Sequence, residues 1–146
     1  MADHGINVSR ADTAVATPNA ATCGIPFVIG TAPLSKATGT AATAGTPVLC
    51  TSYTEAEEQL GYDDDWAKYT VCEVMHYHFK LCACQPVIFL PLAENAEAAA
   101  VAAAVEQVEA CLTMFGIVPD LIMAPGFSKD ATVSAAIDAK AGSING

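Results

Sequence analysis

The sequence predicts an α/β fold in which a small, mostly parallel sheet is flanked by helices and preceded by an extended N-terminal arm. Four short, continuous apolar runs are typical of buried strands: 25–31, 47–51, 86–92 and 120–126. Helix-periodic segments separate most of these runs, and such alternation favours a parallel sheet with helical connections. Residues 1–20 lack helical periodicity and are rich in small and β-compatible residues, which predicts an arm outside a domain over 21–146.

The first part of the domain contains two strands and a short helix. The Gly-, Ala- and Thr-rich stretch 32–45 after the first strand predicts a loop. After the second strand, either Ser52 or Thr54 is placed to cap a helix, because a glutamate stands three residues after each. Gly61 is expected to end this helix.

A longer helix is expected next. The three consecutive aspartates 63–65 fit the positive end of a helix that begins near Trp66, and they lack the alternating ligands of a calcium loop. Apolar residues recur at steps of three and four along this helix and predict its buried face: Trp66, Tyr69, Cys72, Val74, Met75, Phe79 and Cys82.

The run 86–92 is apolar at every position, which is typical of a central strand covered on both faces. The alanine-rich segment from Asn95 to Phe115 predicts the next helix, which Gly116 terminates. Its apolar stripe is expected to contain Val101, Val105, Val108, Leu112 and Phe115. Small alanines on the other faces permit close approach by a neighbouring element.

The last elements are a strand and a helix. The run 120–126 predicts a fourth buried strand that ends in a Pro-Gly corner, and Ser128 is expected to cap a helix running toward Gly142. A doubly wound domain with so few strands rarely closes on a helix. We therefore expect the 21–146 domain to be incomplete at its C-terminal end.

The composition excludes several classes of protein. Hydrophobic residues make up 53% of the 146 positions and charged residues 15%, and the net charge is −10. Arg10 is the only arginine and the lysines are scattered, which disfavours nucleic-acid binding. The most apolar long segment, 86–105, carries two glutamates and does not predict a membrane span. No secretory signal is visible, so we expect synthesis in a cytoplasm, with reduced thiols and with part of this charge-poor surface covered by a partner.

The six cysteines are expected to be reduced and mostly buried, because their spacing is irregular and most stand in apolar runs. The pair Cys82 and Cys84 near His76 and His78 is the only cluster that resembles a metal site. Structural zinc sites use wider Cys pairs, and histidines two residues apart point to different sides of a helix. The sequence therefore predicts no metal or other cofactor.

Catalytic motifs are also missing from the places where an α/β sheet binds ligands, which are the carboxyl ends of its strands. Ser52, Glu94 and Ser128 are the polar residues expected there, and no histidine accompanies them. Each serine has a simpler role as a helix cap, so we expect no enzymatic activity. The alternative is a small flavodoxin-like ligand-binding or hydrolytic domain with a pocket around these three residues.

Several motifs resemble the contractile phage tail sheath family. The resemblance spans nearly the whole chain, including its opening residues 1–8. The segment 47–62 with Trp66 resembles the part of the family that comes after its first strand. The family's Pro-Val strand and its Pro-Asp-hydrophobic-Ala-Pro-Gly signature are matched by Pro86, Val87, Pro119, Asp120, Ala124, Pro125 and Gly126.

The resemblance implies a structural, non-enzymatic protein of the virion. Sheath subunits stack as rings around a tail tube and contract to drive the tube through a cell envelope. The implied partners are further copies of the chain, the tube protein, and baseplate and tail terminator proteins, with assembly in the host cytoplasm. In the family, arms lend strands to neighbouring subunits, a role that falls here on the arm 1–20, with Gly5, Ile6, Asn7, Val8 and Val15.

The chain departs from the family pattern in two respects. It is shorter than usual, because Leu92 is followed almost directly by a helix where many members carry an additional domain. It also stops before the family's C-terminal domain and arm. We therefore expect a short or truncated sheath subunit, which leaves contraction by this chain alone in question.

Overall fold

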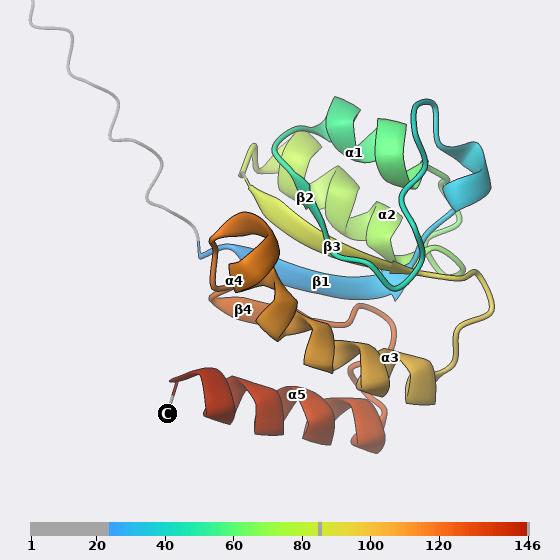
Figure 1. Cartoon of the computed structure of the whole chain (residues 1–146). Helices are drawn as coiled ribbons and strands as arrows, with labels where there is room; N and C mark the ends of the chain where they lie inside the picture. Colours follow the sequence, from blue (N-terminus) through green and yellow to red (C-terminus); the bar gives the residue numbers. More distant parts are fainter. Residues whose placement is uncertain (1–23, 85, 146) are drawn as a thin grey trace, which may run out of the picture.

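A computed structural model describes residues 24–84 and 86–145, and it confirms the predicted α/β fold (Figure 1). A mixed, mostly parallel sheet has the strand order β2-β3-β1-β4. Strand β1 is parallel to both β3 and β4, whereas β2 is antiparallel to β3. The strands are β1 (Pro26–Thr31), β2 (Val48–Cys50), β3 (Val87–Leu92) and β4 (Leu121–Met123).

The predicted N-terminal arm lies outside the described residues. The structure therefore bears on the domain after it, and the inter-subunit role expected for residues 5–15 stays a prediction.

Helices cover both faces of the sheet, and every residue of β1 and β3 is therefore buried. Phe27 and Ile29 face one core, and Val28 faces the other. The Val28 face is covered by α1 (Tyr53–Leu60), α2 (Thr70–Met75) and its π-helical continuation η2 (His76–Leu81). The Phe27 face is covered by α3 (Ala98–Ala104), the 3₁₀ segment η3 (Val105–Glu109), α4 (Ala110–Phe115) and α5 (Ala131–Asn145).

Strand β2 is antiparallel because no crossover helix precedes it. After β1 the chain makes the short 3₁₀ turn η1 (Leu34–Lys36) and then a loop. This loop stays at the carboxyl end of the parallel strands, where Gly45 N–H donates to the Pro91 carbonyl at 2.8 Å. A chain that has not crossed the sheet must descend antiparallel to its neighbour. The carboxyl end of β2 therefore lies beside the amino ends of the parallel strands β1, β3 and β4.

The helix expected to begin near Trp66 begins instead at Thr70, so that prediction was wrong. Thr31 and Thr70 exchange hydrogen bonds: each backbone N–H donates to the hydroxyl oxygen of the other residue, at 3.2 Å. The Thr31 hydroxyl also donates to the Lys68 carbonyl at 2.6 Å. The start of α2 is thus fixed by β1. The aspartates 63–65 shape the preceding turn and do not cap the helix, with Asp65 accepting from Lys68 N–H.

The helical run expected from Asn95 begins at Ala98. Its buried apolar face shifts around the helix axis at η3. A 3₁₀ segment turns each residue by 120° instead of 100°, so five such residues rotate the face that α4 turns toward the core. Val101, Val105 and Val108 are buried as expected, but the next core residue is Cys111. Leu112, predicted to be buried, is 58% exposed.

The last helix is capped by Asp130, and the prediction for Ser128 was wrong. The Asp130 carboxylate accepts from Thr132 N–H at 2.9 Å, whereas Ser128 N–H donates to the Ala124 carbonyl in the turn after β4. Lys140 fixes α5 to η3, because its buried ammonium pairs with Glu106 and, at 2.8 Å, with Glu109.

Replacing Thr70 by valine should lower the free energy of unfolding by about 1–3 kcal/mol, because Thr31 N–H would remain buried without an acceptor. Urea denaturation measures the change. Thr113→Val is the matched control, since Thr113 is exposed on α4. Equal stability of the two variants would contradict the assigned role of Thr70.

Candidate strand-docking interface

Strand β4 is an open edge of the sheet. The sequence predicts a buried strand here, but the side chains of Ile122 and Met123 are only partly buried and Leu121 is 52% exposed. The reason is topological, because within the described part of the chain β4 pairs with β1 alone. Strand β4 therefore presents one side without a neighbouring strand (Figure 1).

The open side of β4 presents backbone hydrogen-bonding groups. Asp120 N–H donates to the Ile25 carbonyl of the chain entering β1, at 2.9 Å. Pro26 has no N–H, so its pairing with Leu121 uses the N–H and C=O groups of Leu121. Because backbone groups of successive residues alternate in direction along a strand, Leu121 and Met123 face β1, and the N–H and C=O of Ile122 point away from it. Such unpaired groups are the usual template for adding a strand.

A groove of about 810 Å³ runs along this open edge. Its floor comes from β4 and the turn after it, through Ile122, Met123 and Ala124. One wall comes from α2 and η2 on one face of the sheet, and the other comes from α5, which lies beyond β4 (Figure 1). The principal wall residues are Glu73, Val74, Tyr77 and His78 on the first side and Ser134, Ile137, Asp138 and Ala141 on the second.

The groove continues toward the start of β4 and has an acidic character. A smaller hollow of about 170 Å³ shares Ile122, Ile137 and Ala141 with it. Glu73 and Asp138 stand on opposite walls, and no lysine or arginine of the described residues lines either hollow. Partial burial lowers the pKa of His78, so this side chain is neutral at pH 7 and does not offset the carboxylates.

The residues of the family signature frame this edge. Asp120 precedes β4, and its carboxylate accepts from Ile25 N–H at 2.8 Å, which ties β4 to the start of β1. Ala124 is buried and its carbonyl accepts from Phe127 N–H at 3.1 Å. Gly126 has φ +78°, and a Cβ there would lie 2.9 Å from the Thr70 methyl group. The signature thus builds the two ends of β4.

The other signature residues lie elsewhere in the same sheet. Pro86 directly precedes β3, and Val87, the first residue of the strand, is fully buried. Pro119 is buried beside Asp120 and lines the smaller hollow.

Ser52, Glu94 and Ser128 do not form the single pocket that the alternative function requires. Ser52 lies at the amino ends of the parallel strands because β2 is antiparallel to them. Its hydroxyl accepts from Glu55 N–H and caps α1. Glu94 pairs with Lys68 at 2.8 Å. Ser128 lines the groove without either of the other two.

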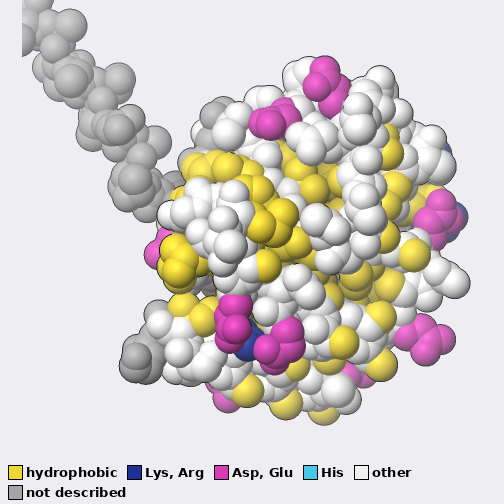
Figure 2. Space-filling model, in the orientation of Figure 1, with side chains coloured by type: hydrophobic (Ala, Val, Ile, Leu, Met, Phe, Trp, Pro, Cys, Tyr) yellow, Lys and Arg dark blue, Asp and Glu magenta, His cyan; other side chains and the backbone are white. Residues whose placement is uncertain are grey.

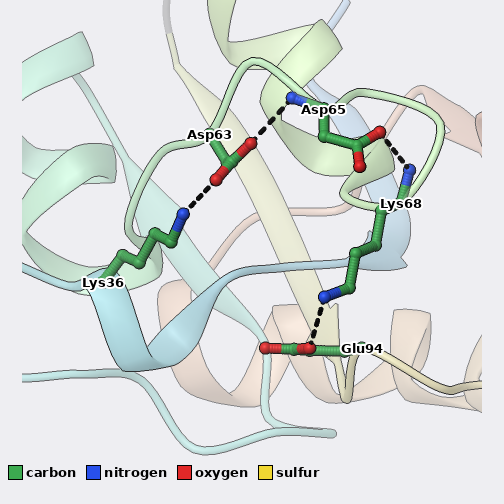
Figure 3. A network of polar contacts seen from close by, with 5 residues as sticks. All are labelled: Lys36, Asp63, Asp65, Lys68 and Glu94. Carbon is green, nitrogen blue, oxygen red and sulfur yellow. Dashed lines mark hydrogen bonds and ion pairs between the residues drawn. The ribbon is translucent and has the colours of Figure 1, made fainter.

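A chain of exposed polar contacts connects the loops at the carboxyl ends of the strands (Figure 3). Lys36 pairs with Asp63, and Lys68 pairs with Glu94. Hydrogen bonding to the two lysines lowers the pKa of Asp63 and of Glu94. Any stability from these pairs is therefore present above the unfolded pKa of the carboxyls and is lost as the pH falls through the folded values. Exposed pairs of this kind mainly order the loops.

The structure gives no metal site in its described part, since there no group of three or more His, Cys, Asp or Glu side chains is suited to hold an ion. His76 and His78 are both partly buried. Cys50, Cys72 and Cys111 are buried thiols, and desolvation raises their pKa to about 12, 11 and 11. Cys82, predicted to be buried, is exposed because the helix ends at Leu81.

Apolar side chains also reach the surface over and beside α4 (Figure 2). The exposed members are Leu112, Met114, Val118 and Leu121. By length and composition the run Ala98–Phe115 could span a membrane, but Val101, Val105, Val108 and Cys111 of this run are buried against the sheet. This pattern is typical of a core helix.

Comparison with known proteins gives no assignment: no protein-family model matches the chain, and no curated protein matches it significantly.

Sequence reasoning missed the residues of the groove. Glu73 and Asp138 each stand in a helix whose sequence pattern indicates only one buried face. No local sequence pattern shows that both helices line the open side of β4. The short apolar run Leu121–Met123 was the available signal, because a strand of three residues is typical of a sheet edge.

Alkylation tests the assigned burial of the thiols. At pH 8, iodoacetamide should modify Cys82 in the folded protein, whereas Cys50, Cys72 and Cys111 should react only after unfolding because burial disfavours their thiolates. Peptide mass spectrometry reads out each site. Modification of a buried cysteine at the rate of Cys82 would contradict the packing of these three thiols in the core.

Proposed function

We propose that the chain is a structural, non-enzymatic subunit of a contractile tail sheath that assembles as stacked rings around a tail tube. The resemblance of the signature motifs supports this, together with the position of Asp120, Ala124 and Gly126 at the two ends of β4. The proposed partners are other copies of the chain, the tube, and baseplate and tail terminator proteins. The proposed location is the virion, with assembly in the host cytoplasm.

The open edge of β4 carries the proposal. Its unpaired backbone groups lie on the floor of a groove whose walls rise on both faces of the sheet, which is the shape left by an absent neighbouring strand. A strand from another subunit would complete the sheet through backbone hydrogen bonds. The arm 1–20 is the proposed donor of such a strand.

The remaining surface is consistent with assembly. Charged residues make up only 15% of the chain, and exposed apolar side chains lie on α4, after it and at the start of β4. Contiguous exposed apolar patches often mark interaction sites. The net charge of −10 would keep unassembled subunits apart in solution.

A ligand-binding domain is the second candidate function. The observation that favours it is the volume of the groove, about 810 Å³, which is within the range of small-molecule sites. Native mass spectrometry of the purified protein separates the candidates, since a bound metabolite would favour this function over assembly.

Assembly is tested with donor and acceptor variants. The full chain should form rings or tubes in electron micrographs. Deletion of residues 1–20 removes the proposed donor strand, and Ile122→Pro removes the N–H of the acceptor edge, so each variant should fail to form polymers. Ile122→Ala is the matched control, because it removes the same side chain and keeps the N–H.

Mixing the two defective variants sharpens the test. One retains the acceptor edge and the other retains the arm, so together they should form heterodimers, but no polymer, in analytical ultracentrifugation. A full chain that stays monomeric at high concentration, or an Ile122→Pro variant that assembles like Ile122→Ala, would contradict the proposal.

A further inference from the structure

The groove along β4 carries charge of one sign on both walls. Glu73 projects from α2 and Asp138 from α5, and within the described residues neither carboxylate has an ion-pair partner. Two lysines form ion pairs outside the groove: Lys68 pairs with Glu94, and Lys140 pairs with Glu106 and Glu109. The groove therefore offers two uncompensated negative charges beside an apolar floor.

A strand bound in this groove would meet both walls. Successive side chains of a strand point to opposite faces of the sheet, so alternate residues would face the α2 wall and the α5 wall. Apolar side chains would contact Val74 and Ile137, while a basic side chain on either face would approach Glu73 or Asp138. An acidic side chain at the same place would be repelled, and both effects are strengthened where water is partly excluded.

We propose that the groove selects an extended peptide segment that alternates apolar and polar residues and carries a lysine or arginine near its centre. This inference deepens the proposed function and rests on it for the natural source of the strand, which is another copy of the chain. The selectivity itself is a property of the folded monomer, so it is measurable without polymer formation. The arm contains the only arginine of the chain, Arg10, outside the described residues.

Two labelled peptides of alternating valine and threonine test the selectivity, one with a central arginine and its twin with a central glutamate. Fluorescence anisotropy with the full chain, kept dilute enough to be monomeric, should show about tenfold tighter binding of the arginine peptide. The double variant Glu73→Gln/Asp138→Asn should remove most of this difference. The control Glu58→Gln/Glu97→Gln changes the net charge equally, away from the groove, and should retain the difference.

Placement in the groove is tested with Ile122→Pro and Ile122→Ala, because the Ile122 N–H points to the open edge. The proline variant should weaken binding of both peptides about tenfold relative to the alanine variant, because it removes one backbone hydrogen bond to the added strand. Equal affinity of the two peptides for the unmodified chain, or no binding of either below about 1 mM, overturns the inference. Rings or tubes that still form in that case would leave the proposed sheath function standing, whereas selective binding without any polymer would reject the sheath and keep the groove.

Discussion

The reciprocal hydrogen bonds between Thr31 and Thr70 are the constraint on which the rest of the structure depends. They join the end of the central strand β1 to the first residue of α2 and leave neither backbone N–H without a partner. The Thr70 side chain also fills the space beside Gly30 and Gly126, where a Cβ would overlap it. One buried threonine therefore positions β1, α2 and the turn after β4, and of these α2 contributes to one wall of the groove and the turn to its floor.

The sheet ends at β2 on one side and at β4 on the other. Because the β1–β2 connection does not cross the sheet, β2 lies antiparallel beside β3. At the other edge, Ile122 of β4 presents its backbone N–H and C=O to the groove. Exposed sheet edges favour association with further strands. The proposed assembly would cover this open edge and part of the charge-poor, apolar-rich surface.

The sequence predicted the elements governed by local pattern. Continuous apolar runs located β1 and β3, and the alternation of strands and helices predicted the α/β fold. It did not predict features set by tertiary geometry. Leu112 is exposed and Cys111 continues the buried stripe because η3 is a 3₁₀ segment, and Asp130 caps α5 because Ser128 N–H belongs to another turn. The groove escaped detection because its walls come from segments more than sixty positions apart, such as Glu73 and Asp138.

Hydrogen exchange at β4 tests the central claim most directly, because it reports the backbone groups on which strand addition depends. In the dilute monomer, the amide of Ile122, which points to the open edge, should exchange quickly, whereas the amides of Leu121 and Met123, which face β1, should be protected. In the assembled state, strand addition predicts that the Ile122 amide also becomes protected. Assemblies in which this amide exchanges as fast as in the monomer would contradict strand addition at β4.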